Sequence, residues 1–446
     1  RNSALEEDKK ICALAKTEGQ VTQIIKALVY MTDLQAENRE DNPILSIQEL
    51  EKEINQVKEP ATSILQSLLA NRYWQYFQRQ RYKLYNRTNT VDYRKEDIST
   101  WTAEDLHKKI STLYLQSLQN KALLQATQLN QFDAIIEKGN VRQLRPTLFD
   151  LLAHAALHYF KNSERDIKKP TYAFELNQPE AFAPAADFIK ARFQTKDTFS
   201  LHHKALLIYQ ELLQFHLADK DPSALIDADI DRLQFVNQYA VGENKEELYR
   251  RALEQLTTKW GRHPVATQAW FLLAAHYHQL ASQYHPLKDT SNRYVRVQAR
   301  AILEQVVKDG AEKNEGWSNS YNLLQEINQQ VYRFDIEQVN IPGQPFRALT
   351  TYRNTAALHF RILKADANLK KIMRNIHEDK HWEALTKTTP LRSWQQALPA
   401  TKDLQEHAVE VKIDALPVGE YILLTATNDD FQKKSHLGAR FFNVSN

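Results

Sequence analysis

The segment at residues 409–425 constrains the fold most, because it has a β pattern in a chain whose first 330 residues have a helical one. Apolar residues alternate with charged ones over 409–413, which is typical of a strand with one buried face. Pro417 and Gly419 then supply turn residues, and the continuous apolar run at 421–424 predicts a second, more deeply buried strand. We therefore expect a β-hairpin here, in a chain whose earlier part has a helical pattern.

The first 330 residues predict a helical array. The chain has only 9 glycines and 14 prolines in 446 residues, and such scarcity of helix breakers favours long helices with short connections. At roughly 100 to 200 residues per domain, the chain is too long for one compact core. The apolar periodicity predicts helices at 3–16, 21–34, 47–57, 61–85, 103–120, 149–159, 185–192, 200–218 and 223–239, with a turn-rich interval at 86–100.

An internal repeat appears late in this array. The sequence LEQL at 253–256 is echoed by LEQV at 303–306, and each precedes a predicted helix that carries a tryptophan, Trp270 or Trp317. Two-helix units whose apolar stripes need neighbours have the geometry of tetratricopeptide-like arrays. The interval exceeds the about 34 residues of that repeat, so the similarity is one of geometry and not of motif.

The pattern changes from helical to alternating after residue 330, and it predicts strands at 331–336, 357–363 and 438–444. Between them, residues 367–397 are interpreted as a long polar insertion. The predicted fold class is mainly α with a C-terminal β domain. A helical-hairpin, tetratricopeptide-like array at 1–330 precedes a fibronectin-like β-sandwich at 331–446.

The charge and cysteine content limit the kinds of function that this chain can have. The formal net charge is +3, from 58 Lys+Arg against 55 Asp+Glu, so no global field recruits nucleic acid or an anionic membrane. No run approaches the about 18 apolar residues of a membrane span. The chain begins at Arg1, which we interpret as a sign of a trimmed fragment. Cys12 lies in an apolar-periodic run, and we expect a buried small hydrophobe there and not a reactive nucleophile.

The strongest enzyme-like signal is a histidine pair. His154 and His158 lie one helical turn apart, as in a zinc protease, but Ala155 stands where the general base of an HExxH motif would be. A structural or surface histidine pair is the favoured interpretation.

Other catalytic signals are weaker still. His276 and His278 are two residues apart, which directs them to different faces of a helix, and His202 and His203 have no carboxylate partner nearby in sequence. The sequence contains no G-x-S-x-G, Walker or G-x-G-x-x-G motif. We therefore predict a non-enzyme without catalytic residues, metal ligands or a cofactor.

The aromatic and basic run at 72–87, RYWQYFQRQRYKLYNR, carries the residue types that stack on bases and contact phosphates. On a helix, however, Tyr73, Phe77 and Leu84 recur on roughly one face, and the flanking arginines extend to solvent. Core packing is thus favoured over nucleic-acid binding, with a protein-docking surface as the other alternative, since Trp, Tyr and Arg dominate binding hot spots.

Several short motifs lie in the β region, at 331–341, 352–354, 358–363, 415–421 and 441–446, and in the helical region, at 3–6, 24–28, 73–77 and 98–101. Together they resemble the large alpha-2-macroglobulin family proteins of the Bacteroidetes. The β motifs are similar to an early macroglobulin domain, and the helical ones to the region that precedes such domains. The resemblance implies an exported protease-trapping protein, periplasmic or associated with the outer membrane, in which cleavage of a bait segment collapses a shell of β-sandwiches onto the protease.

The family's thioester, where present, uses a Cys-x-Glu-Gln motif, whereas Cys12 lies in Cys-Ala-Leu-Ala, and no bait segment is recognisable. The resemblance therefore implies a non-catalytic N-terminal portion whose helices act as an assembly or docking platform. Its expected partners are proteins, either proteases or cell-envelope components. The alternative is a free-standing helical-repeat scaffold with an accessory β binding domain.

Overall fold

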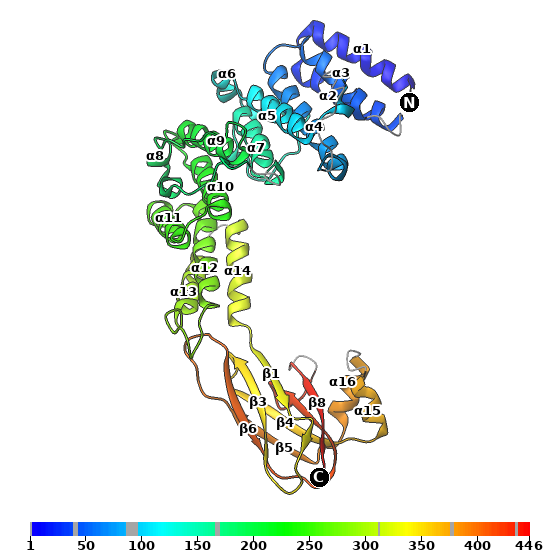
Figure 1. Cartoon of the computed structure of the whole chain (residues 1–446), viewed down its shortest axis with the longest axis vertical. Helices are drawn as coiled ribbons and strands as arrows, with labels where there is room; N and C mark the ends of the chain where they lie inside the picture. Colours follow the sequence, from blue (N-terminus) through cyan, green and yellow to red (C-terminus); the bar gives the residue numbers. More distant parts are fainter. Residues whose placement is uncertain are drawn as a thin grey trace. The chain divides into compact units, whose positions relative to one another are not determined.

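The structure is a computed structural model that describes residues 2–38, 43–85, 97–165, 170–310, 313–374, 379–432 and 436–446. The chain forms two compact units, Arg1–Ala266 and Thr267–Asn446 (Figure 1). No helix in these ranges combines the length and the apolar character that crossing a bilayer requires.

The first unit is helical. Its α-helices are α1 (Asn2–Glu18), α2 (Val21–Asn38), α3 (Pro43–Ile54), α4 (Ala61–Tyr85), α5 (Ala103–Ser117), α6 (Lys121–Ala126), α7 (Leu148–Phe160), α8 (Ala185–Phe188), α9 (Leu201–His216), α10 (Ser223–Tyr239) and α11 (Lys245–Trp260). Short 3₁₀ turns join some of them, at η1 (Ile98–Thr100), η2 (Leu129–Phe132), η3 (Arg142–Leu144), η5 (Pro179–Phe182) and η6 (Pro264–Ala266). Neighbours in sequence pack on one another, as in α1 with α2 and α9 with α10.

Local sequence fixes where two central helices begin. Thr102 and Thr147 each precede a helix with an aspartate at the third helical position, and both pairs form complete capping boxes. The threonine hydroxyl accepts a backbone N–H and the aspartate carboxylate returns the interaction, which satisfies donors that a helix start leaves free. The predicted starts of α5 and α7 are therefore within one residue of the observed ones, whereas the helix predicted at 185–192 ends at Phe188.

An aromatic core joins α4, α5 and α7. Phe77, Tyr159 and His107 are buried, and the rings of Phe77 and His107 lie 4.6 Å apart. The His107 Nδ1 atom is 2.8 Å from the Tyr159 hydroxyl, so one nitrogen of this buried ring has a polar partner. The stretch at 86–96 of the predicted turn-rich interval lies outside the described residues.

The second unit begins with three helices, α12 (Thr267–Ala281), α13 (Val295–Asp309) and α14 (Glu315–Asn328), which all pack on one another. Gly316 lets α14 approach α12, since a Cβ there would lie 2.3 Å from the Gln268 backbone nitrogen. The predicted domain boundary at residue 330 coincides with the change from helix to strand. The compact units, however, divide at Ala266, because α12–α14 pack with the β region that follows.

The β region is a two-sheet sandwich. Its strands are β1 (Val331–Ile336), β2 (Val339–Asn340), β3 (Phe346–Arg353), β4 (Ala357–Lys364), β5 (Arg392–Ala397), β6 (His407–Ile413), β7 (Gly419–Ala426) and β8 (Gly438–Val444). One sheet has the order β1-β3-β6 and the other β2-β8-β7-β4-β5. All pairings are antiparallel except that of β2 with β8. The fold class predicted from sequence, mainly α with a C-terminal β domain, is confirmed.

The core of the sandwich lies between the two sheets, with Phe334, Ala348 and Val411 from one and Phe360 and Phe442 from the other. These residues alternate with exposed ones along their strands, as in β6, because successive side chains point to opposite faces. The period-2 pattern in the sequence therefore predicts β1, β4, β6 and β8 well.

The predicted hairpin is wrong. Strand β6 pairs with β3, whereas β7 pairs with β4 and β8, so the two strands lie in different sheets. The connection crosses between the sheets and buries Leu416 on the way. The Tyr421 hydroxyl then donates to the Pro417 carbonyl oxygen over 2.9 Å, four residues upstream. A tyrosine at the start of a strand that bonds back to the preceding connection is the tyrosine corner of Greek-key sandwiches.

The interpretation of residues 367–397 as a polar insertion is also wrong. It contains α15 (Ala367–Arg374), α16 (Asp379–Lys387) and β5. Leu369 and Leu385 of these helices pack on Ile422 and Leu424 of β7, and Figure 1 shows the helices beside the sheet. The few apolar residues among many charges are enough for helices that bury only one face. They also explain why β7 is buried on both faces.

Candidate functional site

The histidine pairs singled out from the sequence do not meet in one site. His154 and His158 both lie on α7, but His158 is exposed, while burial lowers the pKa of His154 to about 4. A ring held neutral by its surroundings is typical of a structural histidine. Across the described ranges, no three or more histidine, cysteine, aspartate or glutamate side chains are arranged to hold a metal ion.

In each of the other two pairs, both histidines lie on the same helix but have different surroundings. His276 is buried, whereas Nε2 of His278 lies 3.7 Å from Oε1 of Glu326. His202 packs its ring 4.2 Å from that of Tyr239, and Nε2 of His203 lies 2.7 Å from the Phe193 carbonyl oxygen. The different environments fit the expectation that adjacent and near-adjacent residues of a helix face different directions.

Cys12 and the apolar face of the aromatic run lie in the core, as predicted. Cys12 is buried, and burial raises the pKa of its thiol, which works against thiolate formation. Tyr73, Phe77 and Leu84 are buried on one face of α4, and Arg81 pairs with Glu164. Arg87, the last residue of the run, lies outside the described residues.

Sequence reasoning missed a buried charged group in the first unit. His216, at the end of α9, lies between Asp150 Oδ1 at 2.6 Å from Nε2 and Asp219 Oδ2 at 2.7 Å from Nδ1. Burial lowers the pKa of His216, but the hydrogen bonds to Asp150 and Asp219 outweigh this and raise it above its usual range. Because both ring nitrogens face carboxylates, the imidazolium is the form that satisfies the network. Asp150 also caps α7, so this network ties α7 to α9.

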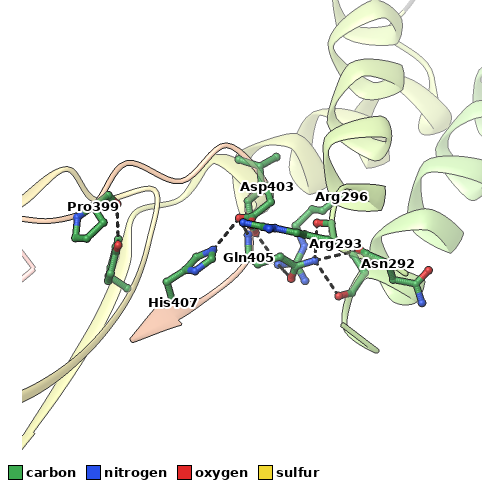
Figure 2. Close-up of polar contacts among 10 residues, drawn as sticks. Asn292, Arg293, Arg296, Pro399, Asp403, Gln405 and His407 are labelled. Carbon is green, nitrogen blue, oxygen red and sulfur yellow. Dashed lines mark hydrogen bonds and ion pairs between the residues drawn. The ribbon is translucent and has the colours of Figure 1, made fainter. Parts of the chain in front are cut away.

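A second polar network joins the residues just before α13 to the loop before β6 in the second unit (Figure 2). The carboxylate of Asp403, 1% exposed, accepts from Arg293 Nε at 2.8 Å and contacts His407 Nε2 at 2.8 Å. Gln405 donates to three backbone carbonyl oxygens, including that of Ala281. Burial raises the pKa of Asp403, and the hydrogen bonds from His407 and Arg293 outweigh it, so the pKa is lowered overall.

This network contains an Asp–His pair, as catalytic triads do. Asp403 also accepts hydrogen bonds from Arg293 and from the Gln405 backbone N–H, so its carboxylate joins three parts of the chain. The network therefore holds the loop between β5 and β6 against the helices.

A groove of about 510 Å³ lies where the chain passes from β1 to β2, between the sheets' edges. It is lined by Glu337, Val339, Asn340, Ile341, Gln344, Pro345, Phe346, Arg347, Glu410 and Lys412. Val339 and Ile341 are 55% and 61% exposed, which is high for apolar side chains. Arg347 pairs with Glu410 at 2.7 Å, and the two acids and two bases of the lining balance. With no histidine, cysteine or serine in its lining, the groove offers binding surface and not a nucleophile with its base.

No protein-family profile matches the chain, and no curated protein matches it. The resemblance to the macroglobulin family therefore rests on the sequence motifs alone.

Proposed function

We propose that this chain is the non-catalytic N-terminal portion of an exported alpha-2-macroglobulin-like protein. In this role the helices serve as an assembly or docking platform for protease trapping, and the protein lies in the periplasm or at the outer membrane. The partners are proteins, either the trapped proteases or envelope components.

The observation that carries the proposal is the placement of the motif at 415–421. In the sequence this motif resembles part of a macroglobulin domain, and in the fold it forms the tyrosine corner through which the chain crosses between sheets. The resemblance implies a fibronectin-like β-sandwich, and the two-sheet sandwich that contains this corner is compatible with it. The polar networks support a non-catalytic role, since the Asp–His contacts at His216 and His407 hold helices and loops together.

The first test is the size of the natural protein. An antibody against this chain would isolate the protein from its source cells, and mass spectrometry of the intact protein would give its length. The proposal expects a much larger protein with further β-sandwiches after Asn446. A natural protein that ends near Asn446 would refute it.

The second test is protease challenge of the isolated natural protein. A trap that encloses a protease leaves its activity on small peptides and blocks its activity on large proteins, because only the large substrate is excluded. We expect this size-dependent inhibition together with a mobility shift on a native gel. A matched sample whose bait segment has already been cleaved serves as the control, and equal activity on both substrates would contradict trapping.

The alternative function, a free-standing scaffold, is favoured by one observation. The sandwich exposes Val339 and Ile341 beside a groove whose charges balance, which suits the binding of protein surface over that of nucleic acid. A short natural protein without size-dependent inhibition would support this second function.

A further inference from the structure

Three cationic side chains surround one exposed aromatic ring in the first unit. The ring is that of Phe199, 39% exposed, in the loop that leads into α9. Its centroid lies 5.6 Å from Lys108 Nζ on α5, 5.9 Å from Lys204 Nζ on α9 and 6.0 Å from Arg165 Cζ after the end of α7. These distances are within the range of cation–π contacts, and they bring together three charges that are far apart in sequence.

The carboxylate of Asp197 lies at this cluster, but it is already bonded to Arg165. Nη1 and Nη2 of Arg165 donate to its two oxygens at 3.0 and 2.9 Å, and Asp197 is 1% exposed. The backbone N–H of Phe199 donates to the same carboxylate at 3.3 Å. In the part of the chain that the structure describes, neither Lys108 nor Lys204 has a carboxylate within ion-pair distance.

The surroundings of Lys204 carry an excess of positive charge. Its Nζ donates to the Thr198 carbonyl oxygen at 2.8 Å, which is an uncharged acceptor. Burial and, after it, the charge of Arg165 lower the pKa of Lys204 to about 8, against the opposing charge of Asp197. Lys108 is exposed and adds its charge on the side of the ring that faces solvent. Such a cluster is stabilised by an added negative charge.

We propose that the surface around Phe199 binds an acidic segment of a partner protein through Lys108 and Lys204. Carboxylates of the partner supply the negative charge that the two lysines lack, as hydrogen bonds between charged groups. Alternate residues of an extended segment lie about 7 Å apart on one face, a spacing that suits two lysines flanking one ring. The methylene groups of glutamate side chains pack on the exposed ring of Phe199.

The number of cations favours a polypeptide over a nucleic acid. Nucleic-acid binding depends on many phosphate contacts along a basic track, whereas this surface offers two lysines for direct contact and the whole chain has a formal net charge of only +3. This inference names the chemistry of a partner. It does not depend on the macroglobulin proposal, and each can fail without the other.

The test uses the full chain and a fluorescein-labelled hexaglutamate peptide, with binding followed by fluorescence anisotropy. Hexaglutamine is the uncharged control, and a thymidine hexanucleotide tests the nucleic-acid alternative. We expect saturable binding of hexaglutamate that weakens as salt is added, and no binding of hexaglutamine. The absence of saturable hexaglutamate binding would refute the proposal. Tighter binding of the oligonucleotide than of hexaglutamate would overturn the class of partner.

Three variants test the residues. Lys108→Gln and Lys204→Gln should each weaken hexaglutamate binding by about three- to fivefold, the effect of one partly exposed charge pair. The matched control is Lys259→Gln in the same unit, where Nζ lies 4.9 Å from the ring centroid of Trp260. The control should bind as the unsubstituted chain does. Equal affinity of all three variants would show that the peptide does not bind around Phe199.

Proton linkage gives a second readout that a general attraction to positive charge does not give. Because carboxylates favour the charged form of Lys204, hexaglutamate should bind more weakly as pH rises from about 7 to about 9, and Lys204→Gln should remove this dependence.

Labelling of the unsubstituted chain keeps the test decisive if a variant fails to fold. Acetic anhydride at about pH 8 acetylates neutral amines, so Lys204 should react faster than Lys259, and mass spectrometry of peptides measures both rates. Hexaglutamate should slow acetylation of Lys204 and leave that of Lys259 unchanged. Equal rates at Lys204 with and without the peptide would overturn the placement.

Discussion

The tyrosine corner provides the most direct check of the corrected topology. Tyr421 is 1% exposed, its ring lies 5.7 Å from that of Phe442, and its hydroxyl donates to the Pro417 carbonyl oxygen at 2.9 Å. Tyr421→Phe keeps the ring and its packing and removes only this hydrogen bond. The loss leaves a carbonyl oxygen without its donor at the crossing between the sheets. We expect the free energy of opening of the sandwich to fall by about 1 kcal/mol.

Hydrogen–deuterium exchange is the suitable assay, because it reports on the sandwich separately from the helical unit. A loss of about 1 kcal/mol corresponds to about fivefold faster exchange of the protected amides of β7 and β8. The control is Tyr321→Phe, since Tyr321 is 42% exposed and stacks on Trp317 without a hydrogen bond from its hydroxyl within the described chain. It should leave exchange in the sandwich unchanged. Identical exchange in Tyr421→Phe and the unsubstituted chain would refute the role given to this hydroxyl.

Three further predictions concern both units. Because hydrogen bonds to two carboxylates raise the pKa of His216, its contribution to stability is complete at low pH and is lost as pH rises through its folded-state pKa. Urea unfolding from about pH 6 to about pH 9 should show this loss of stability, and His216→Gln should flatten the pH dependence. Burial lowers the pKa of His107 to about 4, so the unfolded state takes up the proton first and His107 should cost the first unit about 3 kcal/mol of stability as pH falls from about 6.5 to about 4; His107→Gln should remove this share, whereas the similar share of His154 remains. Gly316→Ala places a Cβ against the backbone of α12 and should destabilise the second unit by about 1 to 3 kcal/mol in thermal unfolding, whereas Gly139→Ala, with open space around it, should change stability by less than about 0.5 kcal/mol.

The hairpin error shows where local pattern reasoning stops. The alternation at 409–413 and the apolar run at 421–424 are both strands, as predicted. A turn with Pro417 and Gly419 is compatible either with a hairpin or with a crossing between sheets. The motif does carry a signal that favours the crossing. A tyrosine two residues after the glycine can donate a hydrogen bond to the Pro417 carbonyl oxygen, and this is the tyrosine corner of a connection between sheets.

The polar networks were harder to find from sequence. Thr147 and Asp150 have the spacing of a capping box, which predicts the start of α7. Nothing in their spacing indicates that His216, on a later helix, contacts the same aspartate. Likewise, Arg293 and Asp403 are distant in sequence, and only the tertiary structure brings the guanidinium Nε within 2.8 Å of the carboxylate.

The sequence by itself determined most of the helices and strands of this protein. Periodicity and the scarcity of glycine and proline predict the helices, the alternating pattern predicts most strands, and capping residues locate two helix starts, because all of these depend on neighbours within a few residues. Only the tertiary structure decided which sheet each strand joins, that α12–α14 belong with the sandwich, and which buried charges meet. Those outcomes depend on contacts between apolar faces and charged groups that are distant in sequence. The pattern of a single sequence does not show which of them come into contact.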